Sequence, residues 1–342
     1  MRRFSILLFL FALLSCSDDA VHVTTGVYFW ENDTPELTKE NSAALDSLQV
    51  EKLYIKVFEV DRENEKNKPV AKSSLKLTAE TLNNRKVVPC VFVLNKVMIQ
   101  SSKEELDELA DNLVFLVSKY LNEKLSDAKI DCSELQIDCD WSEKSQGNYF
   151  YFLRKVKEIW KKEVSCTLRL YPYKFNNKMG VPPCDRAMLM CYNLLNPLNN
   201  PRKNTILDID EMSKYLDTEV DYPIALDVAL PVYSWIQCYD RERFKGVVYG
   251  PVESYAHLLE HDEGLWYHSK SDTVLANVFI RKGDRIKWER VSQEDLSKAV
   301  EIIKKAKVLK NEATLSYFHL SSEELNFYNY ETLHSYSSRL SD

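Results

Sequence analysis

The sequence predicts an α/β fold, a (β/α)8 TIM barrel with a small α+β insertion after the seventh strand. Short apolar runs alternate with helical segments along the chain, an order typical of parallel sheets. The run at residues 87–94 is apolar nearly throughout, as expected for a parallel strand covered on both faces. Eight such units within 342 residues match the size of a closed barrel.

An open, doubly wound sheet is the alternative fold. Sheets of that kind commonly bind phosphate groups at a glycine-rich loop after the first strand. This chain has only 7 Gly and no such loop. We therefore favour the closed barrel.

The first residues resemble an export signal. Arg2 and Arg3 precede an apolar run at residues 4–14, which is too short to span a bilayer. Leu13-Leu14-Ser15-Cys16 is similar to a bacterial lipobox. We expect residues 1–15 to be a signal peptide, Cys16 to carry lipid and residues 16–24 to form a tether. An outer-membrane lipoprotein, periplasmic or surface-exposed, is then expected; a cleaved signal with an incidental Cys16 is the alternative.

Composition excludes some classes of partner. The formal charge is -7 and no basic run stands out, so we expect no nucleic acid partner. The chain lacks a CxxC pair, so no zinc or redox motif is supported, and we expect no cofactor and no metal. We interpret Cys90, Cys139, Cys166 and Cys191, which lie in apolar runs, as buried packing residues.

The predicted elements follow in order along the chain. Strands are expected at residues 26–30, 53–60, 87–94, 135–142, 164–173, 187–194, 224–235 and 314–320. Helices are expected at residues 35–48, 103–125, 149–160 and 293–307. The barrel domain would cover residues 25–342, with an insertion at about 240–291 that does not fit the repeat. Within it we expect a helix at 253–260, and strands at 274–280 and 285–291 joined by a hairpin turn.

The fourth strand, residues 135–142, carries the main functional signal. Side chains alternate across a strand, so Asp138 and Asp140 share one face, and the opposite face is apolar. Two carboxylates one strand step apart in a core repel each other and lose their water. We interpret them as a site, and a structural ion network is the alternative.

The same alternation predicts the charges inside the barrel. Lys56 on strand two, Arg169 on strand five and Asp227 on strand seven would face the lumen with the two aspartates. Barrel active sites lie at the carboxyl ends of strands. The further residues expected there are Trp30, Glu59, Trp141, Tyr171, Tyr192, Asn193, Tyr233 and Trp235. Aromatic faces suit sugar C–H groups, so we expect a glycan or oligosaccharide partner; simple packing of the rings is the alternative.

Three strands resemble, in order, the family 18 glycoside hydrolases, the chitinase and endo-N-acetylglucosaminidase group. That family's strand four reads D-x-x-D-x-D-x-E, and Asp138 and Asp140 match its second and third Asp. Met190-Cys191-Tyr192-Asn193 is similar to the family's Met-x-Tyr-Asp on strand six. Leu230-Pro231-Val232-Tyr233 is similar to its Leu/Val-Pro-x-Tyr on strand seven. The resemblance implies the barrel fold, a glycan containing N-acetylhexosamine, and stabilising roles for the two aspartates.

Two positions depart from the family pattern. Leu135 stands at the first Asp position, and Ser142 stands at that of the catalytic Glu, which donates a proton to the leaving oxygen. General acid catalysis contributes typically ~10²–10⁴-fold, and a serine does not supply it. Glu59, at the end of strand two, is therefore our candidate acid. An exported glycoside hydrolase and a non-catalytic glycan-binding or scaffold lipoprotein both remain open.

One competing motif lies in the insertion. His257-Leu258-Leu259-Glu260-His261 matches H-x-x-E-H, which on a helix places two His on one face, as zinc requires. The segment sits in a short insertion beside Asp262 and Glu263. We favour a solvated helix end.

Overall fold

The structure is a computed structural model that describes residues 21–30, 37–62, 69–72, 82, 85–125, 131–217, 220–250, 252–276 and 278–341. The expected signal peptide at 1–15, the lipid on Cys16 and most of the tether lie outside these residues. Within the described ranges, no helix combines the length and the apolar character needed to cross a membrane. The end of the expected tether belongs to the barrel, because the first strand begins at His22.

Eight parallel strands close into a barrel. They are β1 (His22–Phe29), β2 (Lys52–Arg62), β4 (Lys86–Val93), β5 (Glu134–Asp138), β6 (Glu163–Arg169), β7 (Arg186–Met190), β8 (Ala225–Pro231) and β16 (Glu312–Phe318). β1 pairs with both β2 and β16, which closes the ring. β3 (Pro69–Lys72) adds to β2 as an antiparallel strand outside the barrel. The predicted (β/α)8 barrel is confirmed.

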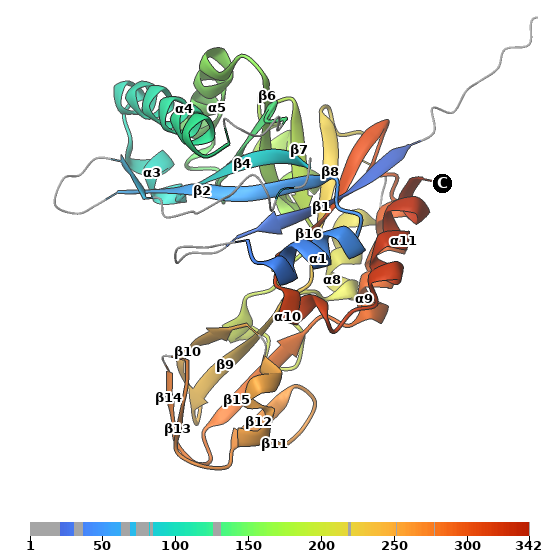
Figure 1. Ribbon diagram of the computed structural model, residues 1–342. Coiled ribbons are helices and arrows are strands. Elements are labelled where there is room, and N and C mark those ends of the chain that lie inside the picture. Colours follow the sequence, from blue (N-terminus) through green and yellow to red (C-terminus); the bar gives the residue numbers. More distant parts are fainter. Residues whose placement is uncertain are drawn as a thin grey trace, which may run out of the picture.

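Helices lie around the barrel (Figure 1). They are α1 (Lys39–Ser47), α3 (Asn95–Gln100), α4 (Lys103–Leu125), α5 (Gln146–Trp160), α6 (Leu170–Lys174), α7 (Asn176–Met179), α8 (Ile209–Leu216), α9 (Gln293–Lys305), α10 (Ser322–Leu325) and α11 (Tyr330–Ser341). α1 starts later than the expected residue 35, because the hydroxyl of Thr38 caps it by accepting from the backbone N–H of Asn41.

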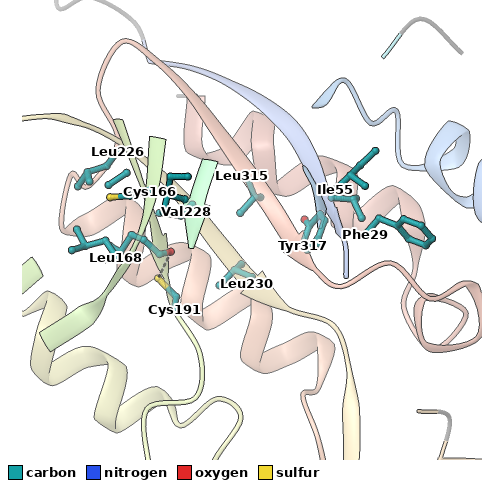
Figure 2. Close-up of a cluster of buried hydrophobic side chains, with 14 of the residues drawn as sticks. Phe29, Ile55, Cys166, Leu168, Cys191, Leu226, Val228, Leu230, Leu315 and Tyr317 are labelled. Carbon is teal, nitrogen blue, oxygen red and sulfur yellow. Dashed lines mark hydrogen bonds between the residues drawn. The ribbon is translucent and has the colours of Figure 1, made fainter. Parts of the chain in front are cut away.

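The main core fills the space between the strands and the helices. Figure 2 shows part of it, with Ile55, Leu168, Val228 and Leu315 projecting from the outer face of the barrel. The inner face carries a second, smaller cluster, which consists of Tyr28, Tyr54, Val88, Cys90, Met188, Tyr192 and Ala229. The four cysteines interpreted as packing residues are buried, as predicted.

A β-bulge in β2 changes which side chains face the lumen. Lys56 pairs with Cys90 and Phe58 pairs with Val91, so the residue between them is extra. Phe58 faces outward, where its ring lies 6.1 Å from that of Tyr120 on α4. Glu59 therefore turns into the lumen, whereas strict alternation from Lys56 would place it outside.

The insertion forms a sheet of its own. β8 ends at Pro231, and the predicted strand through residue 235 divides into β8 and β9 (Ser234–Asp240). The sheet has the antiparallel order β10-β9-β15-β12-β11, with β10 (Arg243–Tyr249), β11 (Leu259–His261), β12 (Trp266–Ser269) and β15 (Arg285–Arg290). In Figure 1 it extends beyond α10, away from α4 and α5. The insertion thus begins at Ser234, before the expected residue 240.

Two predictions within the insertion differ from the structure. The expected helix at 253–260 is present as a 3-10 helix, η2 (Val252–Leu258), which ends earlier than predicted because β11 begins at Leu259. The expected hairpin pairs differently, because β14 (Val278–Ile280) pairs with β13 (Thr273–Leu275), whereas β15 pairs with β9 and β12. His257 and His261 consequently do not share a helix face. His261 lies against the Gly264 carbonyl at 3.1 Å, and Glu260 pairs with His268.

A buried ion pair fixes the insertion to the loop after β7. Lys287 and Glu289 are both fully buried, with Lys287 Nζ 2.6 Å from Glu289 Oε1. The ammonium also donates to the carbonyl oxygens of Asn200 and Lys203, each at 2.8 Å. Glu289 accepts from the hydroxyl of Thr205 at 2.8 Å and from the indole N–H of Trp235.

Candidate functional site at the barrel mouth

Asp138 is the last residue of β5 and faces the lumen. The hydroxyl of Thr167 on β6 donates to Asp138 Oδ1 at 2.5 Å. Burial raises the pKa of Asp138 to about 7, the hydrogen bond from Thr167 opposes this rise, and the negative charge of Asp140 adds to it. At neutral pH this carboxyl therefore exists in both protonation states.

Asp140 lies nearer to solvent than Asp138. Its Oδ2 atom forms an ion pair with Arg169 Nη2 at 2.5 Å. Both side chains are about half exposed. Sequence alternation placed Arg169 within the lumen, but the structure places it at the rim. The two aspartates therefore differ in environment, since one is half-buried and hydrogen-bonded and the other is ion-paired in solvent.

Glu59 and Lys56 project from β2 on the other side of Phe92. Lys56 Nζ lies 3.6 Å from Glu59 Oε2 and 5.5 Å from the centre of the Trp30 ring. Phe92 pairs with Glu59 on one side and with Asp138 on the other. Adjacent strands lie about 4.8 Å apart, so the Cα atoms of Glu59 and Asp138 are separated by roughly 10 Å on one level.

Aromatic rings line the inner part of the mouth. The rings of Tyr192 and Phe318 stack with centres 5.2 Å apart. Trp30 lies 6.0 Å from Phe318 and 6.2 Å from Phe92. Trp30, Phe92 and Phe318 are partly exposed, so their faces are available to a ligand.

A second set of rings leads outward onto the insertion. Tyr233 lies 6.5 Å from Tyr192 and 6.0 Å from Trp235, and Trp235 lies 5.8 Å from the exposed ring of Tyr249. The Tyr233 hydroxyl donates to Asn193 Oδ1 at 2.7 Å. Trp235 belongs to β9, so the insertion contributes directly to the mouth. We call Trp30, Phe318, Tyr192, Tyr233, Trp235 and Tyr249 the aromatic series.

Two predicted site residues do not lie at the mouth. Trp141 is buried behind β5, where its ring stacks on Tyr149 of α5 at 6.1 Å, because its side chain has the opposite parity to Asp140. Asp227 lies toward the amino ends of the strands, where it accepts from Arg186 Nη1 and from the backbone N–H of Thr314, each at 2.7 Å. Asp227 therefore belongs to a structural ion network.

Tyr171 lies at the rim. The predicted strand five ends at Arg169, and the next residues form α6, which carries Tyr171. Its exposed ring lies 4.8 Å from that of Phe175. A ligand extending past Arg169 would meet these two rings.

Beyond Asp140, neither Ser142 nor Glu143 places a further acid in the mouth. The hydroxyl of Ser142 accepts from the side-chain amide of Asn95 at 3.4 Å. Glu143 points to the surface and pairs with Lys178 at 2.5 Å, both side chains being exposed. Of the carboxylates predicted for the site, Asp138, Asp140 and Glu59 are those that the described part of the chain places at the mouth. Among the residues that the structure describes, no group of three His, Cys, Asp or Glu could hold a metal ion.

Sequence reasoning did not select several residues that complete the mouth. Phe92 and Phe318 are the penultimate and last residues of their strands, so the rule that selected Trp30 could have found them. Thr167 faces the lumen by alternation, but no sequence signal identifies Asp138 as its acceptor. Tyr249 lies beside Trp235 because β10 pairs with β9. This pairing was not predicted from the sequence.

Comparisons with known proteins agree with this fold. No protein-family model matches the chain, and none of the curated proteins is detectably similar in sequence. Solved structures do match. The spore cortex-lytic enzyme SleL of Bacillus megaterium superposes with a TM-score of 0.54 at 12% identity, covering 92% of this chain and 75% of that one. A chitinase of Chromobacterium violaceum gives 0.53 at 12%, covering 91% and 98%.

A third match is the C-terminal domain of a putative chitinase of Desulfitobacterium hafniense, with a TM-score of 0.54 at 9% identity, covering 94% of this chain and 99% of that domain. At such identities the likeness shows the fold. The barrel is thus one that glycoside hydrolases of the chitinase type use, in agreement with the fold that the sequence resemblance implied.

Proposed function

We propose that this protein binds glycans containing N-acetylhexosamine at the mouth of its barrel, as an exported lipoprotein. The observation that carries the proposal is the aromatic series, which begins beside Trp30 in the lumen and ends at Tyr249 on the insertion. The accessible rings at its two ends, Trp30 and Phe318 inside and Tyr249 outside, offer apolar faces to sugar units, whereas Tyr192, Tyr233 and Trp235 are buried between them and support their packing. Asp140, Arg169 and Asn193, which lie at the mouth and are partly or largely exposed, offer hydrogen bonds to hydroxyl and acetamide groups.

The class of sugar follows from the family resemblance and from the chitinase-type barrel. Binding without turnover is the first form of the proposal, because Ser142 stands at the position of the family's proton donor. Its hydroxyl is engaged by Asn95, and Glu143 next to it pairs with Lys178 at the surface. Neither side chain replaces the missing acid.

Hydrolysis is the second candidate, and one observation favours it. Glu59 and Asp138 lie on the same level, on either side of Phe92, because of the bulge in β2. Glycoside hydrolysis ordinarily uses two carboxyl groups that flank the scissile bond. In this form Glu59 is the relocated acid, and Asp138 and Asp140 stabilise the reacting sugar.

Fluorescently labelled chito-oligosaccharides test both forms. We expect anisotropy titration to show binding by the wild type and a loss of about tenfold in affinity, equal to ~1.4 kcal/mol, for Trp30→Ala. Phe115→Ala is the matched control, because that ring is exposed on α4, outside the barrel. It should bind as the wild type does.

Product formation over a day separates binding from hydrolysis. No product from the wild type supports glycan binding without turnover. Product from the wild type that disappears in Glu59→Gln and in Asp140→Asn supports the hydrolase. Absence of binding to chito-oligosaccharides and to N-glycans would refute the proposal in both forms.

A further inference from the structure

Two buried cysteines in neighbouring segments lie in contact. Cys166 is on β6, and Cys184 is in the segment that leads into β7. Both side chains are buried, and their Sγ atoms are 3.4 Å apart. Figure 2 shows Cys166 together with Cys191, which follows the last residue of β7 and by contrast lies against the Leu189 carbonyl oxygen at 3.8 Å.

The backbone holds the two sulfur atoms in register. The backbone N–H of Asp185, the residue after Cys184, donates at 2.8 Å to the carbonyl of Val164, two residues before Cys166. Cys166 itself pairs with Ala187 in the parallel ladder of β6 and β7. A disulfide bond needs an Sγ–Sγ distance of about 2.05 Å, so the sulfur atoms must approach by little more than 1 Å.

We propose that Cys166 and Cys184 form a disulfide bond when the protein folds in an oxidising compartment. The oxidant is a low-molecular-weight or protein disulfide, and the reaction is two steps of thiol–disulfide exchange. One cysteine thiolate attacks the oxidant, forms a mixed disulfide and releases one oxidant thiolate. The second cysteine thiolate then attacks the protein sulfur of the mixed disulfide and releases the other. The two protein thiols are oxidised, the oxidant disulfide is reduced to two thiols, and the two protons pass to the released thiolates.

The reaction should take place before folding is complete, because folding buries both thiols. The neighbouring thiol of Cys184 and burial raise the pKa of Cys166, so the reactive thiolate is rare once β6 is packed. The bond should therefore form while the segment before β7 is still open. After folding, the same burial excludes external thiols, and the disulfide should resist reduction.

The bond would fix one wall of the barrel mouth. The chain between the two cysteines contains α6, which carries the exposed ring of Tyr171, and Phe175, whose exposed ring lies between α6 and α7. Closing this loop removes open conformations of the segment, so the disulfide should slow its local unfolding.

The test uses the full chain, produced without lipid and refolded from the reduced, denatured state with glutathione disulfide. The refolded protein is then denatured without reductant, so that buried thiols become accessible, and free thiols are blocked with a maleimide. Peptides are mapped by mass spectrometry without reduction. We expect a linked peptide pair containing Cys166 and Cys184, and two fewer reactive thiols than the 8 cysteines of the chain. Cys191→Ala, which removes the buried cysteine that follows β7, should leave the linked pair in place.

Hydrogen exchange supplies a second readout. Peptides from residues 170–179 should exchange about tenfold more slowly in the oxidised protein than in the reduced one. In Cys184→Ala this difference between oxidised and reduced samples should vanish, whereas Cys191→Ala should retain it. Reaction of all cysteines after refolding, or linkage of Cys166 to any residue other than Cys184, would overturn the proposal. The wild-type map decides the matter even if a variant fails to fold.

Discussion

Glu59 and Asp138 lie on one level of the barrel lumen, on either side of Phe92, with which both pair. Lys56 stands beside Glu59, and Asp140 follows Asp138 by two residues. The protonation of Asp138 therefore depends on charges that single substitutions can remove.

Removing these charges should move the pKa of Asp138 in opposite directions. The positive charge of Lys56 lowers that pKa and the negative charge of Asp140 raises it. We expect Lys56→Met to raise the pKa above about 7 and Asp140→Asn to lower it. Carbon-13 NMR of labelled aspartate carboxyls, followed through a pH titration, measures both. Shifts of the same sign in the two variants would contradict the proposed arrangement.

The same carboxyl should make the stability of the fold depend on pH. Its pKa is about 7 in the folded protein and about 3.9 in the unfolded chain, so the folded state holds the proton between these values. The contribution is fully present below about pH 4 and is lost as the pH rises through 7. We expect the free energy of unfolding of the wild type, relative to Asp138→Asn, to fall by roughly 1–4 kcal/mol from pH 4 to pH 8. Urea titrations at several pH values would show a constant difference if Asp138 were exposed.

The buried pair in the insertion should respond as a unit. Lys287→Met leaves Glu289 buried without its cation, and the free energy of unfolding should fall by about 3–5 kcal/mol. Combining it with Glu289→Gln removes both charges, so the double variant should be less destabilised than the sum of the two single ones. A double-mutant cycle by chemical denaturation gives the coupling. Additive effects would mean that the two charges do not interact.

The order of the aromatic series predicts a dependence on glycan length. Tyr249 lies at the outer end and is 66% exposed, whereas Trp30 lies at the inner end. We expect Tyr249→Ala to weaken the binding of a labelled hexasaccharide by about tenfold and to leave disaccharide binding unchanged. Trp30→Ala should weaken both. Equal losses for both ligands in Tyr249→Ala would exclude an extended mode of binding.

Substitution of Asp227 tests its place in the structural ion network. Asp227→Asn removes the carboxylate that faces Arg186, so it should lower the free energy of unfolding by about 3 kcal/mol. Glycan affinity should stay within a factor of two or three of the wild type, because Asp227 lies toward the amino ends of the strands. If the variant were stable but lost glycan affinity, Asp227 would belong to the glycan-binding site.

Hydrophobic patterning was sufficient to predict the barrel and most of its lumen. Apolar runs mark the eight strands because both faces of each are covered, and alternation placed Lys56 and Asp138 correctly. Alternation has no information about a bulge, and Glu59 faces inward only because β2 has one extra residue. It also does not show where along a strand a residue lies, so Asp227 was grouped with Asp138 although the two occupy different levels.

The insertion was predicted least well, because antiparallel pairing depends on contacts distant in sequence. Residues around Gly283 do turn, with Asp284 N–H donating to the Arg281 carbonyl, but the strands on either side pair with other partners. The end of β8 at Pro231, after which the chain leaves the barrel for β9, was also not predicted, although a proline has no N–H to donate to a ladder.

The closure of the barrel between β1 and β16 has a consequence for biosynthesis. The register joins His22 to Glu312, so the first strand has no partner on one side until nearly the whole chain has been made. The backbone N–H of Val23 likewise donates to the hydroxyl oxygen of Ser341, near the end of the described chain. At typical translation rates of about 5–20 residues per second, β1 and β8 wait for many seconds with open hydrogen-bonding edges. Unpaired strand edges can pair with other chains. We therefore expect the newly made chain to need chaperones until its last strand has been synthesised.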